Sequence, residues 1–193
     1  MGSRLTRQAS QHRAGLSVRA GKIAGLWHIL PEPIADSRGF FQETFRASLL
    51  TETLGRPYHF AQTNHSRSLA GTLRGFRAEP WDKLIYIPRG TCLCAVVDPR
   101  PDSPTFRQHE TVLMGDPPGS RQRLLVSRGL CNAFYCLTEA DYLNDVSAEY
   151  DPAVRRGFRW DDKALGIDWP CKAPILSDRD AALPDFETYL SGG

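Results

Sequence analysis

Short apolar runs separated by turn residues make up most of the chain from Ile23 onward. Within the clearest runs apolar and polar residues alternate, which is typical of strands that bury one face. Many short strands with Gly, Pro, Asp and Asn between them indicate a sandwich or a barrel. The runs that we predict to be strands are 84–87, 92–97, 111–113, 123–126 and 133–137. Cys92 and Cys94 lie two residues apart in such a run, so they are expected to face the same side.

Helical periodicity is rare in the chain. Residues 47–54 place Leu50 and Leu54 one helical turn apart and stop before Gly55, a residue type that commonly ends helices. A second short helix is expected near residues 178–183. The pattern therefore predicts an all-β fold with a few short helices.

The charge is unevenly distributed along a chain of ordinary globular composition. The 193 residues are 41% apolar and 24% charged, which fits one domain. Residues 1–31 contain five basic and no acidic side chains, whereas residues 32–193 contain 19 basic and 22 acidic ones, a net charge of −3. We predict a basic, disordered arm over residues 1–22 and a single domain over residues 23–193. Because a nucleic-acid-binding domain needs a basic face on its folded body, this balance argues against a nucleic-acid partner.

Membrane and secretory signals are also missing from the sequence. No run approaches 18 apolar residues, and the N-terminal region lacks the apolar core of a secretory signal. The five cysteines are an odd number at spacings that match neither CxxC pairs nor a disulfide framework. We therefore expect free thiols, no membrane association and a cytoplasmic protein.

The motifs of several common enzyme classes are absent. The sequence contains no GxGxxG, GxxxxGK[ST], HExxH or GxSxG motif, which argues against dinucleotide, P-loop, zincin and serine-hydrolase chemistry. The five histidines include no HxH pair, the arrangement that many β-barrel metal sites use. We predict neither a bound transition metal nor another cofactor.

Polar side chains that suit an anionic ligand gather in the runs 36–43, 62–66 and 72–77. Arginine presents a planar fork of donors that matches a diphosphate, and Gln and Asn can pair with the edge of a base. Ordinary turn residues and surface ion pairs would give the same composition, so the residues alone leave both interpretations open.

These runs also carry a resemblance to a known family. The strings 36–43 (DSRGFFQE), 60–68 (FAQTNHSRS), 73–76 (LRGF), 97–100 (VDPR), 103–106 (SPTF), 150–152 (YDP), 157–162 (GFRWDD), 167–170 (IDWP) and 176–180 (LSDRD) resemble, in this order, motifs of the dTDP-4-dehydrorhamnose 3,5-epimerase family. The resemblance extends over roughly residues 23–186, nearly the whole chain.

The resemblance implies a cupin jelly-roll barrel and a homodimer that shares its N-terminal strands. It also implies that a nucleotide-diphosphate deoxyhexose binds in the barrel mouth. The residues that it assigns to the dTDP portion are Arg38, Glu43, Gln62, Asn64 and Arg74. Asn132, Asn144 and Tyr150 are further candidates for substrate binding.

The positions of the family's catalytic pair are occupied by other residues. Arg77 stands where the family has the His that removes protons beside the 4-keto group. A guanidinium has a pKa above about 12, so it cannot serve as a base at neutral pH. Asn144 stands at the position of the family's acidic Tyr, and Asn132 replaces a second pocket His. Tyr142 lies two residues earlier, on the same face of a regular strand, and is a displaced substitute for the Tyr.

Two other functional positions of the family are retained. Lys83 matches the Lys that stabilises the enolate oxygen, and Asp180 matches the Asp that orients the catalytic His. Without that His, we expect Asp180 to pair with Arg77. The segment between Arg77 and Lys83 is shorter than in the family, which should reshape the rim of the sugar pocket. A thiolate at Cys94 or Cys131 is an alternative reactive group.

Three hypotheses follow. The first is a divergent epimerase-like homodimer that binds a nucleotide sugar or a related anion without standard double epimerisation. The second is an active isomerase or 3-epimerase that uses Lys83 or Tyr142 for proton transfer. The third is a non-catalytic binding or scaffolding dimer. For the first two, Lys83, Tyr142, Arg77 and Asp180 are the candidate catalytic residues.

Overall fold

Strands dominate the computed structural model, which describes residues 15–192. The strands are β1 (Leu16–Ala20), β2 (Leu26–Pro31), β3 (Ile34–Asp36), β4 (Gly39–Phe41), β5 (Gln62–Ser68), β6 (Leu73–Ala78), β7 (Lys83–Arg89), β8 (Thr91–Val97), β9 (His109–Gly115), β10 (Arg123–Val126), β11 (Cys131–Cys136) and β12 (Ala140–Val146). The helices are α1 (Ala47–Leu54), the 3-10 turn η1 (Pro152–Val154), α2 (Asp178–Ala181) and α3 (Phe186–Ser191). Each of the predicted strand runs coincides with a strand to within a few residues, so those predictions are confirmed.

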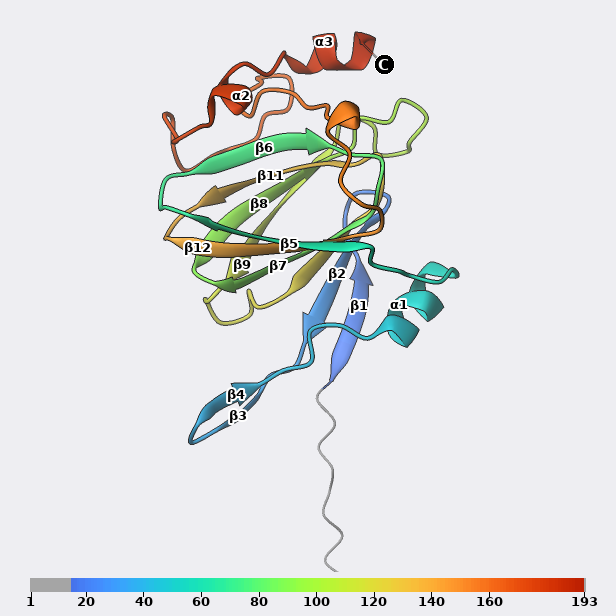
Figure 1. Ribbon diagram of the computed structural model, residues 1–193, viewed down its shortest axis with the longest axis vertical. Helices are drawn as coiled ribbons and strands as arrows, with labels where there is room; N and C mark the ends of the chain where they lie inside the picture. Colours follow the sequence, from blue (N-terminus) through green and yellow to red (C-terminus); the bar gives the residue numbers. More distant parts are fainter. Residues whose placement is uncertain (1–14, 193) are drawn as a thin grey trace, which may run out of the picture.

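Two antiparallel sheets pack against each other to form the barrel (Figure 1). The six-stranded sheet has the order β1-β2-β10-β7-β12-β5, and the four-stranded sheet has the order β6-β11-β8-β9. Strands β5 and β6, which are consecutive in the chain, are therefore edge strands of different sheets. This arrangement leaves one side of the barrel bounded by the two edges.

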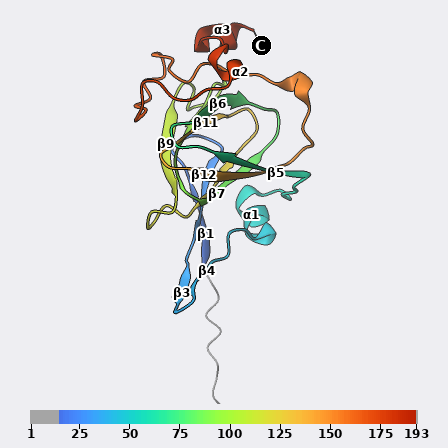
Figure 2. The same ribbon diagram turned by 60° about the vertical axis from the view of Figure 1, so that its left-hand side comes forward.

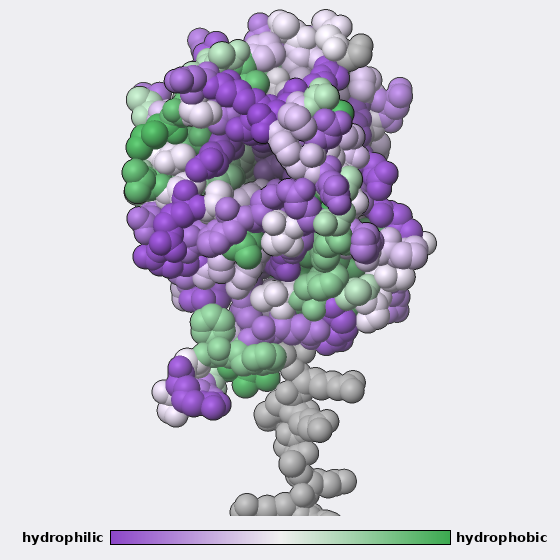
Figure 3. Space-filling model, in the orientation of Figure 1, coloured by the Kyte–Doolittle hydropathy of each residue, from purple (hydrophilic) through white to green (hydrophobic). Residues whose placement is uncertain are grey.

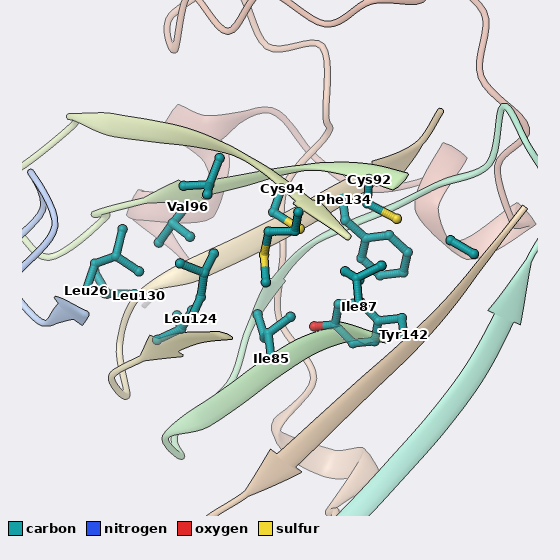
Figure 4. Close-up of a cluster of buried hydrophobic side chains, with 14 of the residues drawn as sticks. Leu26, Ile85, Ile87, Cys92, Cys94, Val96, Leu124, Leu130, Phe134 and Tyr142 are labelled. Carbon is teal, nitrogen blue, oxygen red and sulfur yellow. The ribbon is translucent and has the colours of Figure 1, made fainter. Parts of the chain in front are cut away.

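The core fills the space between the sheets with apolar side chains from both (Figure 4). Cys92 and Cys94 both belong to this cluster, as their spacing predicts. Burial raises the pKa of the Cys94 thiol far above its usual range. For Cys131, burial raises the pKa to about 12. All five cysteines are free, and burial makes Cys94 and Cys131 small core residues whose raised pKa disfavours the thiolate.

The N-terminal boundary differs from the prediction. β1 pairs with β2 along its whole length, from Leu16 opposite Pro31 to Ala20 opposite Trp27. The prediction of a disordered arm is thus wrong for Leu16–Ala20. The segment is ordered because Leu16 and Val18 pack against an apolar cluster. The basic composition of the segment gave no indication of this packing. Residues 1–14 of the predicted arm lie outside the described residues.

The helices lie at the two ends of the barrel (Figures 1 and 2). α1 has the predicted bounds and ends at Gly55, whose φ of 65° is the left-handed conformation that glycine adopts readily. α2 forms in the predicted region, and α3 was not predicted. None of the helices in residues 15–192 is long and apolar enough to cross a membrane.

The β3–β4 hairpin projects from the barrel as a two-stranded ribbon (Figures 1 and 2). Ile34, Phe40 and Phe41 are exposed on it, and Phe41 is 66% exposed. Figure 3 shows apolar side chains gathered where the hairpin leaves the body. A two-stranded ribbon is marginal by itself in water, and exposed apolar residues of this kind often mark an interaction surface.

Candidate functional site

A polar cavity of about 190 Å³ lies between the two sheets on the side bounded by β5 and β6. Five strands contribute to its wall. The lining residues are Ser66 from β5, Arg74 and Arg77 from β6, Lys83 from β7, Asn132 and Phe134 from β11, Tyr142 and Asn144 from β12, and Glu79 just after β6. The cavity therefore combines cationic and neutral hydrogen-bonding groups with one carboxylate.

An irregularity in β6 brings Arg74 and Arg77 to the same wall. Residues three apart in a regular strand point to opposite faces, yet both arginines line the cavity. Between them the pairing with β11 shifts, because Arg77 lies opposite Asn132 whereas Arg74 lies opposite Phe134. Gly75 makes this possible, since its φ is +123° and a Cβ there would lie 2.7 Å from backbone of β11.

Lys83 is the most deeply buried charge in the cavity wall, with 2% of its surface exposed. Its Nζ donates a hydrogen bond to Asn132 Oδ1 at 2.6 Å and lies 2.8 Å from Glu79 Oε2. An ammonium has three N–H donors, and these two contacts use at most two of them. One donor is left for an oxygen of a bound ligand.

Arg77 is paired with Asp180, as the sequence predicts. Its Nη2 lies 2.8 Å from Asp180 Oδ1 and donates a hydrogen bond to Oδ2 at 3.1 Å. The Asp180 side chain is only 1% exposed. Ser177 caps α2 by accepting a hydrogen bond from the Asp180 backbone N–H, which holds the carboxylate beside β6.

Tyr142 and Asn144 both line the cavity, which confirms that they share a face of β12. The Tyr142 ring stacks on Phe134 with centroids 4.2 Å apart (Figure 4). Its hydroxyl lies 3.5 Å from Asn132 Nδ2. Burial raises the pKa of Tyr142 well above its ordinary value. The phenol is therefore a proton-bearing group in this cavity.

Three other predicted binding residues, Gln62, Asn64 and Tyr150, are not among the residues that line the cavity. Gln62 Nε2 donates to Asn64 Oδ1 at 2.5 Å, and Gln62 Oε1 accepts a hydrogen bond from the Tyr150 backbone N–H at 2.9 Å. Arg74 Nε donates to Ser68 Oγ at 3.0 Å, linking the two edge strands. Gln62, Asn64 and Ser68 lie along β5 and Arg74 lies near the start of β6, whereas Tyr150 follows β12.

Arg38 and Glu43 are not brought to the cavity within this chain. Arg38 lies at the tip of the β3–β4 hairpin, 87% exposed, and its Nη2 donates to Asp36 Oδ2 at 2.5 Å. Glu43 forms an ion pair with Arg46 beside α1. A sequence motif gives the types and the order of residues but not their distances in the fold. The separation of Arg38 and Glu43 from the cavity therefore could not be predicted from the sequence.

A comparison with known proteins identifies the chain's relatives. A sequence model described as dTDP-4-dehydrorhamnose 3,5-epimerase matches residues 20–188. The chain belongs to the dTDP-4-dehydrorhamnose 3,5-epimerase family. An enzyme of that name from Shigella flexneri is 35% identical over 155 residues, which cover 78% of this chain and 84% of the relative.

Solved structures of the epimerase family share the fold. A 4-keto-6-deoxy sugar epimerase from the novobiocin biosynthetic gene cluster of Streptomyces spheroides superposes with a TM-score of 0.87 at 34% identity, covering 93% of this chain and 92% of that one. A double mutant of a 3′-monoepimerase from Streptomyces bikiniensis, with His replaced by Asn and Tyr by Phe, was solved with dTDP; it has a TM-score of 0.82 at 34% identity, covering 88% and 87%. The predicted all-β cupin fold is confirmed.

Within this epimerase-family fold, the sequence reasoning missed Glu79 as a residue of the cavity. One signal was available, because Glu79 follows Arg77 by two residues and so shares its face if the strand direction continues. The connection of residues 79–82 between β6 and β7 is short, and it carries Glu79 to the Lys83 ammonium across the junction of the two sheets. The neighbouring Asp82 accepts hydrogen bonds from Arg56 Nη2 and from the Arg128 backbone N–H.

Proposed function

We propose that the chain binds a dTDP-linked 4-keto-6-deoxyhexose in the barrel cavity and does not carry out double epimerisation by the His–Tyr route of its family. The observation that carries this proposal is the ion pair between Arg77 and Asp180. By the resemblance, Arg77 occupies the position of the catalytic base, and a guanidinium is not available to accept a proton at neutral pH. Asn144 at the position of the acid has no proton to transfer.

Binding of the nucleotide sugar is supported by the groups that remain. Arg74, Arg77 and Lys83 line one cavity, and such a concentration of donors favours an anionic ligand. The Streptomyces bikiniensis relative was solved with dTDP although a His and a Tyr are replaced in it. Loss of a His and a Tyr is therefore compatible with nucleotide binding in this fold.

We expect the protein to bind dTDP, and Arg74→Ala to weaken binding about 10–100-fold, because a hydrogen bond to a charged group contributes about 1.5–3 kcal/mol. Isothermal titration calorimetry measures the affinity. The matched control is Arg89→Ala, since Arg89 is exposed and pairs with Glu139 outside the cavity.

NMR of dTDP-4-keto-6-deoxyglucose incubated with the protein is expected to reveal no product inverted at both C3 and C5. Formation of that product, or absence of dTDP binding, would contradict the proposal.

We further propose that the chain is a homodimer joined through its N-terminal strands. The exposed apolar residues of the β3–β4 hairpin supply a surface that a second copy can cover. Such an arrangement also gives Arg38 and Glu43 a role. They lie away from the cavity of their own chain, but a hairpin packed against the second copy can bring them to a nucleotide bound in the cavity of that copy.

Replacing Phe40 and Phe41 together by Ser is expected to convert the dimer to monomers, since the hairpin then loses the apolar area that drives association. Size-exclusion chromatography with light scattering measures the mass. The control is Leu137→Ser, because Leu137 is also exposed but lies outside the hairpin. A wild-type chain that is monomeric, or a double variant that stays dimeric, would exclude this interface.

A further inference from the structure

Glu79 is the single acidic residue among those that line the cavity in the described part of the chain. Its side chain is 17% exposed, so the carboxylate is desolvated on one side and open to the cavity on the other. The ion pair with Lys83 fixes one of its oxygens at 2.8 Å from the ammonium. A carboxylate and a cationic donor thus stand next to each other at the wall where a ligand would lie.

Lys83 lines the same wall and is assigned to the enolate oxygen, and the remaining titratable groups there are unsuited to accept a proton. Arg74 and Arg77 are guanidinium groups, which stay protonated at any pH near neutrality. Tyr142 is buried and its pKa is raised, so its phenol keeps its proton. Cys94, behind the cavity in the core, is buried as well, and its pKa is also raised. Of these side-chain types, only a carboxylate is ionised at neutral pH and able to take a proton.

We propose that Glu79 is the catalytic base that removes the proton from one carbon next to the 4-keto group of the bound sugar, an inference that rests on the proposed function. The electron pair of the broken C–H bond forms the C=C bond of an enolate, and the carbonyl π pair moves onto the oxygen. The free N–H donor of Lys83 stabilises that oxygen. Glu79 holds the proton as a carboxylic acid and exchanges it with solvent, and transfer of the solvent-derived proton from Glu79 back to the carbon restores both the ketone and the carboxylate.

The proposal is confined to one of the two carbons that flank the carbonyl. A relative with this fold is a 3′-monoepimerase, which gives a reaction at a single carbon a precedent in the family. We therefore expect proton exchange with solvent at one of these carbons. This differs from proton transfer by Lys83 or Tyr142, the residues that the sequence suggested.

A purely structural role for Glu79, as the counter-ion of Lys83, has to be distinguished from catalysis. Glu79→Gln keeps the shape but cannot accept the proton, and Glu79→Asp keeps the charge but withdraws the carboxylate by one methylene. A structural counter-ion predicts that Glu79→Asp behaves like the wild type. A base predicts a slower reaction, since a displacement of about 1 Å can cost about 10²-fold in rate.

The test uses the full chain with dTDP-4-keto-6-deoxyglucose in D₂O, and NMR follows deuterium at C3 and C5. We expect exchange at one carbon in the wild type and a rate about 10²–10⁴-fold lower in Glu79→Gln, the usual effect of losing a positioned base. The dTDP affinity is measured for every variant and is expected to remain close to wild type, whereas the melting temperature of Glu79→Gln is expected to fall because the buried Lys83 ammonium loses its carboxylate. The matched control is Glu139→Gln, which removes a carboxylate from the exposed pair with Arg89 and should not alter the rate.

The pH profile provides a second readout. The wild-type rate is expected to rise as the pH passes upward through the titration of a carboxylate, whereas the residual rate of Glu79→Gln should lack this step. Unchanged exchange in Glu79→Gln, or dTDP binding by the wild type without any exchange, would overturn the assignment of Glu79 and leave the proposed binding function intact. Failure of the wild type to bind dTDP would overturn both.

Discussion

Lys83→Met is expected to lower the rate of deuterium exchange next to the 4-keto group by about 10²–10³-fold, the typical loss when a donor to a developing oxyanion is removed. Lys83 is 2% exposed and is oriented by Asn132 and Glu79. In the proposed reaction, such a preorganised ammonium would stabilise the enolate oxygen without having to rearrange. Met preserves most of the apolar stem but has no charge and no donor. NMR in D₂O measures the rate.

The effect of Lys83→Met on folding can be separated from its effect on the reaction. Removing Lys83 leaves the carboxylate of Glu79 without its buried partner, so the melting temperature should fall. The double variant Lys83→Met/Glu79→Gln removes both charges and is expected to recover stability but not exchange. Lys163→Met, at an exposed position, is the control for the loss of a lysine. An exchange rate that is unchanged in Lys83→Met would remove Lys83 from the mechanism.

Gly75→Ala is expected to destabilise the fold by roughly 2–6 kcal/mol, because an unfavourable φ costs about 1–3 kcal/mol and overpacking costs about as much again. The φ of Gly75 is +123°, and a Cβ there would lie 2.7 Å from Ala133 Cα and 2.8 Å from Asn132 O. These are backbone atoms of a central strand and cannot move aside cheaply. Chemical denaturation measures the change, and dTDP affinity should fall with it, since Gly75 sets the face of Arg74 and Arg77.

Gly166→Ala is the matched control for Gly75→Ala. Gly166 also has a positive φ, +62°, but a Cβ there meets nothing within 4 Å. Its substitution is expected to cost about 1 kcal/mol from the backbone conformation alone. Equal effects of the two substitutions would show that the close approach of β6 to β11 does not determine stability.

The strands were predictable where a period of two stands out against clear turn residues. Arg123–Val126 was predicted to the residue, and the other predicted runs lie within β7, β8, β9 and β11 or overlap their ends. β1–β6 and β12 were not identified as strands, and two of them, β1 and β5, show why. Both are edge strands rich in polar residues, so little of their sequence has to be apolar, and pairing with a neighbour decides their conformation.

The candidate site was predictable as far as motifs carry chemistry. The sequence brought Lys83, Arg77 and Asp180 into one hypothesis, and the structure gathers them around or beside one cavity. No motif marked Glu79 as a residue of the cavity. The sequence around Arg38 likewise did not indicate that this residue projects away from the cavity. Distances between segments depend on how strands pair and where connections cross between sheets, which local residue patterns do not encode.

The sequence by itself determined the all-β fold, the family and the identities of the groups available for chemistry, because these follow from periodicity, turn residues and side-chain type. Only the tertiary structure decided which of these groups meet. The bulge at Gly75 turns Arg74 and Arg77 to one wall, the short connection after β6 brings Glu79 to Lys83, and α2 delivers Asp180 to Arg77. The physical reason is that charged groups interact strongly only over a few ångströms and in a suitable orientation. The distance and the orientation both depend on how segments far apart in the sequence pack together.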